Sequence, residues 1–94
     1  MSAGQQTEAR YRVPDHVVHR SFPAETVVLN LQTGRYHGLN PTAGRMLETL
    51  DRLGSLEEAA AVLAGEYSQP LDTVRADLAA FCSDLIERGL IEPA

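Results

Sequence analysis

The chain has 94 residues, 44% of them hydrophobic, and a formal net charge of −5. This length and apolar fraction are typical of one globular domain and argue against wholesale disorder. Because no apolar run approaches the ~18 residues of a membrane span, and Met1–Arg12 lacks the apolar core of a signal peptide, we expect a cytoplasmic protein that has no membrane partner.

The charge is unevenly distributed along the chain. Residues 1–41 carry four arginines against three acids, whereas residues 42–94 carry four arginines against ten acids. Neutralisation of phosphates supplies most of the affinity of nucleic-acid-binding proteins. The acidic second half therefore argues against a nucleic-acid partner.

The N-terminal third is predicted to contain three strands. Residues 1–12 are polar and lack periodicity, which predicts a disordered tail ahead of a domain spanning residues 13–94. A first strand is predicted at residues 16–21. Residues 27–31 and 35–39 follow as a hairpin, since apolar side chains alternate in the first of these runs. The loop between them ends in Gly34, which reaches the positive φ that a three-residue hairpin loop requires.

Three helices are predicted to follow the strands. Asn40 and Pro41 suit the N-cap and first position of a helix that ends at Gly54. Ser55 begins a capping box and a short second helix. The third helix is predicted at residues 70–88. Its apolar seam comprises Leu71, Val74, Leu78, Phe81 and Leu85. Together these elements predict an α+β, winged helix-turn-helix-like domain, with an N-terminal three-stranded antiparallel sheet followed by three helices.

Catalytic and metal-binding patterns are absent from the sequence. His16 and His19 are three apart, so they fall on opposite faces of a strand and predict no metal site. His37 is expected on a binding surface or in solvent. Cys82 lies on an apolar helix between acids and is expected to be a small buried hydrophobe. We therefore expect no enzyme activity, no cofactor and no metal.

Two functional hypotheses remain. A helix-turn-helix is compatible with a winged-helix DNA-binding regulator, but the third helix has more acids than arginines, which is unfavourable for the major groove. The other hypothesis concerns the second strand of the hairpin, residues 35–39. If the strands are ordered in the sheet as they are in the chain, this strand is paired on one side and free on the other. A guest peptide would add to this free edge through main-chain hydrogen bonds.

The amino-acid sequence of the hairpin and of the first helix supports the second hypothesis. Residues 28–31, 33–36 and 39–43, with Leu50, resemble the PqqD-like family of peptide-binding domains. Its C-terminal pattern is matched by Val74, Asp77, Leu78, Phe81, Leu85, Gly89 and Leu90. The similarity covers residues 16–92.

The resemblance implies a non-enzymatic function. Members of this family are precursor-peptide recognition elements of ribosomally synthesised, modified peptides (RiPPs), and this chain looks most like a discrete leader-binding protein of lasso-peptide biosynthesis. The implied partners are a precursor leader peptide, a transglutaminase-like leader peptidase and the asparagine-synthetase-like lasso cyclase. A PqqD-type chaperone of another RiPP pathway is the alternative.

The resemblance also implies where the leader binds. The leader would pair with the third strand in a groove beside the third helix, and the helical flank that begins at Arg75 would face it. The implied peptide-binding residues are Val28, Leu29, Arg35, Tyr36, His37, Gly38, Leu39, Arg75, Leu78, Ala79, Phe81 and Cys82. We expect Leu78→Arg, and a proline at His37, to abolish binding without unfolding. If the His37 N–H points inward, Tyr36 or Gly38 is the sensitive position instead.

Overall fold

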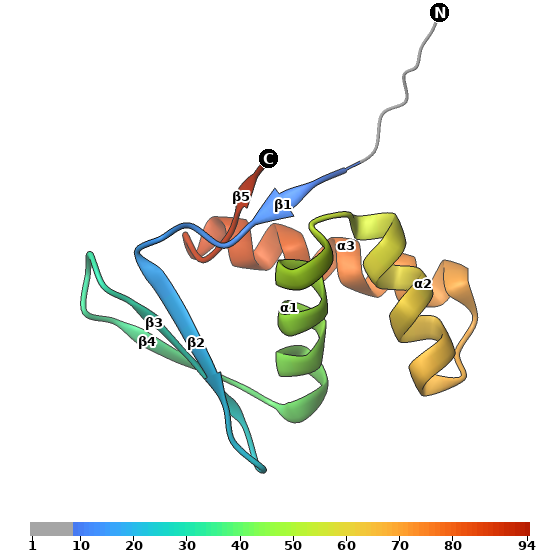
Figure 1. Cartoon of the computed structure of the whole chain (residues 1–94), viewed down its shortest axis with the longest axis horizontal. Helices are drawn as coiled ribbons and strands as arrows, with labels where there is room; N and C mark the ends of the chain where they lie inside the picture. Colours follow the sequence, from blue (N-terminus) through green and yellow to red (C-terminus); the bar gives the residue numbers. More distant parts are fainter. Residues whose placement is uncertain (1–8) are drawn as a thin grey trace, which may run out of the picture.

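The computed structural model describes residues 9–94 (Figure 1). Most of the predicted tail lies outside the described residues, but its last part has regular structure. Strand β1 (Tyr11–Arg12) pairs antiparallel with β5 (Glu92–Pro93) near the other end of the chain. The prediction that the tail extends to Arg12 is therefore wrong at that end, because a partner 80 residues away orders it.

The main sheet has three antiparallel strands in chain order. They are β2 (Val17–Ser21), β3 (Thr26–Asn30) and β4 (Tyr36–Leu39). The hairpin between β3 and β4 is confirmed, and Gly34 has the predicted positive φ, at 75°. The Gly34 N–H donates to the Asn30 carbonyl, which closes the turn.

The three predicted helices follow the sheet and complete the expected α+β fold. They are α1 (Pro41–Leu53), α2 (Leu56–Tyr67) and α3 (Leu71–Glu87). Asn40 and Ser55 are the N-caps of α1 and α2, and each side chain accepts a hydrogen bond from the backbone N–H three residues on. These bonds satisfy donors that the first turn of a helix leaves free.

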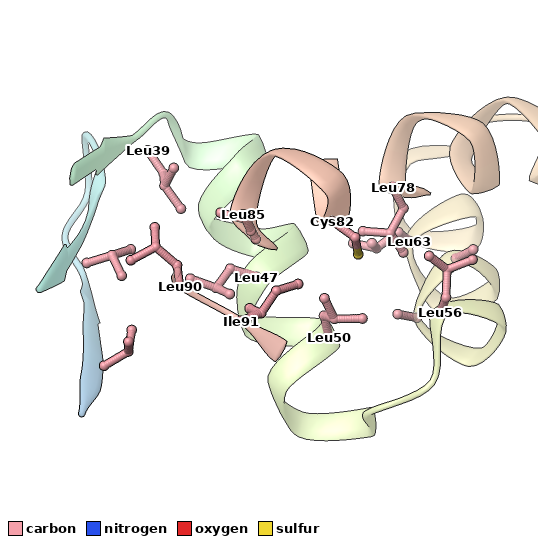
Figure 2. Packing of buried hydrophobic residues seen from close by; sticks show 14 residues of the cluster. Leu39, Leu47, Leu50, Leu56, Leu63, Leu78, Cys82, Leu85, Leu90 and Ile91 are labelled. Carbon is pink, nitrogen blue, oxygen red and sulfur yellow. The ribbon is translucent and has the colours of Figure 1, made fainter. Parts of the chain in front are cut away.

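The core lies between one face of the sheet and the helices (Figure 2). On β3 the buried side chains are those of Thr26, Val28 and Asn30. Helix α1 approaches this face closely at Gly44, where an added Cβ would lie 2.7 Å from the Cβ of Thr26. Glycine at this position therefore lets α1 pack against β3.

The opposite face of the sheet carries no helix (Figure 1). Cross-strand neighbours share a face, and the register places Val18 opposite Leu29 and Leu29 opposite Tyr36. Val18 is 46% exposed and Tyr36 is 73% exposed. We call the side chains of Val18, Arg20, Val27, Leu29 and Tyr36 the outer sheet face. The solvated face of an antiparallel sheet is usually polar, whereas this one is mainly apolar.

Candidate peptide-binding site

The backbone of β4 presents its hydrogen-bonding groups alternately to β3 and to the open side of the sheet. The Asn30 N–H donates to the Arg35 carbonyl at 2.9 Å. Bonded and non-bonded pairs alternate along an antiparallel ladder, so in the observed register His37 is bonded to β3. Tyr36 and Gly38 therefore direct their N–H and C=O groups away from β3, and within residues 9–94 the main sheet has no further strand on that side.

The hairpin that carries this edge is held by its own side chains. The Asn30 carboxamide oxygen accepts from the N–H groups of Gln32 and Thr33, at 2.9 and 3.3 Å. The Thr33 hydroxyl accepts from the Arg35 N–H at 3.2 Å. Since these bonds satisfy the turn internally, the outward groups of β4 are held in place before any guest chain arrives.

A hollow of about 300 Å³ separates the hairpin from the C-terminal end of α3. It is lined by Asn30, Thr33, Arg35, His37, Glu87 and Arg88. The Arg88 guanidinium bonds the Asp84 carboxylate at 3.3 Å. We call this hollow the hairpin cavity; it lies between β4 and α3, where the resemblance implies a groove.

The flank of α3 that the sequence assigned to this groove lies on the other side of the helix. The Arg75 guanidinium bonds Glu57 of α2 at 2.9 Å and Asp72 at 2.7 Å, and these hydrogen bonds raise the pKa of Arg75. Leu78 and Cys82 are fully buried, beside Leu63 of α2 (Figure 2). The expectation that this flank faces the groove is therefore wrong, because α2 covers it.

The opposite flank of α3 borders the open side. Arg88 lines the hairpin cavity, and residues at helical spacings of three and four share its face. These residues are Val74, Asp77, Phe81 and Asp84, which with Arg88 we call the open flank. Phe81 is partly buried and packs against the core, so it is the one predicted helical site residue that belongs to this flank.

The remaining predicted residues are divided between the two faces of the sheet. Val28 and Leu39 face the core, at 0% and 7% exposure, so neither side chain is open to a guest peptide. Leu29 lines a hollow of about 410 Å³ on the outer sheet face. Ala79 is exposed on α3, away from the open flank. The structure thus brings Arg35 and His37 together with the end of α3, and separates them from Arg75 and Ala79.

Sequence reasoning missed Asn30, Thr33, Glu87 and Arg88 as lining residues of this site. The signal for Arg88 was present, since it lies seven residues after Phe81 and shares its face. Nothing in the local sequence indicated that α3 ends beside the hairpin, because the segments that line this hollow are at least 50 residues apart in the chain.

The described residues offer little for chemistry. Cys82 is a buried free thiol, as predicted, and desolvation raises its pKa to about 11, so it stays protonated near neutral pH. Within residues 9–94, no three His, Cys, Asp or Glu side chains gather as metal ligands, and no helix combines the length and apolarity needed to cross a membrane. What this part of the chain presents is an unpaired strand edge beside a polar hollow.

Comparison with known proteins identifies the family. Residues 25–91 match the family described as coenzyme PQQ synthesis protein D (PqqD). No curated protein sequence matches significantly.

Two solved structures are similar. TbiB1 in complex with the TbiA(beta) leader peptide is 34% identical, with a TM-score of 0.79, over 86% of this chain and 94% of TbiB1. A lasso peptide synthetase B1 complexed with the leader peptide is 27% identical, with a TM-score of 0.78, over 90% of this chain and 100% of that chain. This chain therefore belongs to the PqqD family, and its resemblance to PqqD-like precursor-peptide recognition elements is confirmed.

Proposed function

We propose that this protein binds the leader region of a ribosomally synthesised precursor peptide as a fourth strand on β4. The observation that carries the proposal is the outward direction of the Tyr36 and Gly38 backbone groups beside the hairpin cavity. Strand addition uses such an edge for affinity and neighbouring hollows for specificity. Both similar structures are of proteins that hold a leader peptide, which supports the same ligand class for this chain.

The proposed pathway is lasso-peptide biosynthesis, with the protein acting as a binding module in the cytoplasm and not as an enzyme. We expect an affinity between nanomolar and low micromolar, about −8 to −12 kcal/mol. A PqqD-type chaperone for another RiPP pathway would use the same edge. Two observations would distinguish the lasso pathway from another RiPP pathway. One is a short precursor reading frame beside the gene, and the other is a preference of the protein for that leader over leaders of other RiPP classes.

The proposal extends to the enzymes that receive the peptide. A transglutaminase-like leader peptidase and the lasso cyclase are the expected recipients. The outer sheet face supports the first, because exposed apolar patches often mark protein interfaces and a fourth strand on β4 would enlarge this face. A partner docked there would contact the protein and the leader together.

We expect Val18→Lys to slow leader removal by the peptidase while leader affinity stays within about twofold. Unchanged cleavage would exclude this docking face.

A substitution at Tyr36 tests the strand addition. Tyr36 is the first residue of β4 and its N–H points outward, and proline is tolerated at the start of a strand. Tyr36→Pro should remove one donor to the guest and lower affinity about tenfold, since a lost hydrogen bond also leaves a buried carbonyl unpaired. His37→Pro should instead destabilise the fold, because the His37 N–H is bonded to β3.

The measurement is fluorescence polarisation with two labelled peptides, the TbiA(beta) leader and the leader encoded beside the gene. Tyr36→Ala is the matched control, because it removes the ring and keeps the N–H. Equal affinities for Tyr36→Pro and Tyr36→Ala would contradict pairing at this residue. If neither peptide binds, or if the amide NMR signals of Tyr36 and Gly38 do not move on binding, the proposal fails.

A further inference from the structure

The side chain of Glu25 crosses from the β2–β3 turn to the free strand β4. The Phe22 N–H donates to the Glu25 carbonyl at 2.7 Å, which continues the β2–β3 ladder to this residue. Because side chains alternate along a strand, Glu25 shares the outer sheet face with Val27, which pairs with Gly38. An added Cβ at Gly38 would lie 2.8 Å from the Glu25 Oε1. The Glu25 carboxylate therefore occupies the place where another residue at this position of β4 would have its side chain.

The Glu25 carboxylate has no cation beside it in the described part of the chain. Glu25 is exposed and forms no ion pair or side-chain hydrogen bond within residues 9–94. Arg20 lies on the same face of the sheet and forms no ion pair with it. By contrast, Glu57 and Glu66 on α2 each bond an arginine of another helix. The sheet edge thus presents one negative charge, at Gly38, that the described chain does not neutralise by contact.

A guest strand on β4 would bring one of its side chains close to this carboxylate. Gly38 directs its N–H and C=O groups outward, so it would form a hydrogen-bonded pair with the guest residue opposite it. Opposed residues have their side chains on the same face, so this guest side chain would lie on the outer sheet face. Since opposed Cβ atoms are ~4.5–5.5 Å apart, the Glu25 Oε1 would lie within ~8 Å of the guest Cβ. A lysine or an arginine is long enough to reach the carboxylate, and its charge is complementary.

We propose that Glu25 is a specificity-determining residue, which selects a lysine or an arginine at the leader position opposite Gly38 and disfavours an acid there. This inference rests on the proposed function and adds to it a charge preference on the outer sheet face, away from the hairpin cavity. Main-chain pairing alone does not fix the register of a guest. A cation beside Glu25 does, because a shift of one residue would move it to the other face of the sheet. Glycine at position 38 contributes by leaving room for the carboxylate.

A charge scan of the leader tests this selection. The probe is the labelled leader that binds in the polarisation assay, made with either a lysine or a glutamate at one position at a time. At one position we expect the lysine form to bind about fivefold to tenfold more tightly than the glutamate form, because repulsion replaces attraction. Glu25→Lys should reverse the preference at that same position. Glu58→Lys is the control, an exposed acid on α2 whose replacement changes the net charge equally and should leave the preference in place.

Gly38→Ala gives a second readout, because the added methyl group displaces the carboxylate and keeps the main-chain donor and acceptor. Only the far end of the Glu25 side chain has to move, so we expect this variant to fold and to bind leader. Its preference for lysine over glutamate at the selected position should fall below about twofold. A preference that Glu25→Lys leaves unchanged at every position, or that Glu58→Lys reverses as well, overturns the selection and leaves strand addition standing. An absence of leader binding overturns the proposed function, and the selection with it.

Discussion

The two flanks of α3 differ in how fully the chain itself occupies them. On the α2 side, Leu78 and Cys82 are buried and Arg75 is held by two carboxylates. On the open flank, Asp77 has no ion pair within residues 9–94 and Arg88 lines a hollow. One side of the helix is thus covered by α2, whereas the chain itself covers the other side only in part.

This difference teaches where substitutions should affect stability and where they should affect binding. A seam of apolar residues shows that a helix packs, but it does not show which of its two flanks is covered. In this fold α2 covers one flank. The other flank extends from a hollow of about 310 Å³ between α1, α2 and α3 to the hairpin cavity. Three predictions test this difference between the two flanks, in order of decreasing expected effect.

Leu78→Arg should unfold the protein. Leu78 is 0% exposed, so the substitution removes core packing and buries an unpaired charge, at a cost of at least ~4 kcal/mol. That is comparable with the total stability of a small domain. The expectation from sequence, loss of binding in a folded protein, is replaced by loss of the fold. Thermal denaturation followed by circular dichroism measures it, with Leu71→Arg as control, since Leu71 is 40% exposed on the same helix. Equal melting temperatures for the two variants would contradict the burial of Leu78.

Alkaline pH should weaken the fold through Cys82. Burial raises the thiol pKa from 9.0 to about 11, so the unfolded chain loses this proton first. Stability is therefore unaffected below pH 9 and falls as pH rises from about 9 to 11, by up to ~2 kcal/mol. Urea denaturation at pH 8, 9, 10 and 11 measures the loss. The Cys82→Ala variant is less stable at every pH but should lack this decrease in stability between pH 9 and 11. An identical decrease in both proteins would assign the pH dependence to other ionisable groups.

Arg88→Gln and Arg75→Gln compare the flanks at the level of single charges. Arg88 lines the hairpin cavity, so its loss should weaken leader binding about threefold to tenfold, as for one hydrogen bond. Arg75 faces α2, and its loss should leave affinity within about twofold. Since the Arg75 ion pairs are exposed, their effect on stability should be small. Fluorescence polarisation measures both variants, and a larger effect at Arg75 would reverse the assignment of the flanks.

The parts of the fold that local chemistry determines were predictable from the sequence. Asn40 and Ser55 mark helix starts because their side chains bond N–H groups three residues on. The β3–β4 hairpin depends on Gly34, whose positive φ is a property of the turn itself. The free strand edge followed from these elements, and so the position of the candidate site was predictable in outline.

The parts that depend on distant contacts were not predictable. Strands β1 and β5 have two residues each, too few to show alternation. They pair with each other, and β1 also bonds the connection between α1 and α2 at Gly54. The covered flank of α3 depends on packing against α2, a separate helix. Its Glu57 bonds Arg75 but reads locally as a helix-start charge. Asn30 is a polar residue at the end of β3, yet it is buried, and its carboxamide oxygen is satisfied by two N–H groups of the turn.

The pairing of β1 with β5 makes the described chain close on itself. Tyr11 lies opposite Pro93, and the Ala94 N–H donates to the Arg10 carbonyl at 3.0 Å. A short peptide joining residues 10 and 94 would therefore bridge neighbouring points, and the backbone would be open to cutting at the exposed Ser68–Pro70 connection instead. Such a circular permutant would place new ends at the connection between α2 and α3, away from β4, where a fused fluorescent protein would leave the strand edge uncovered.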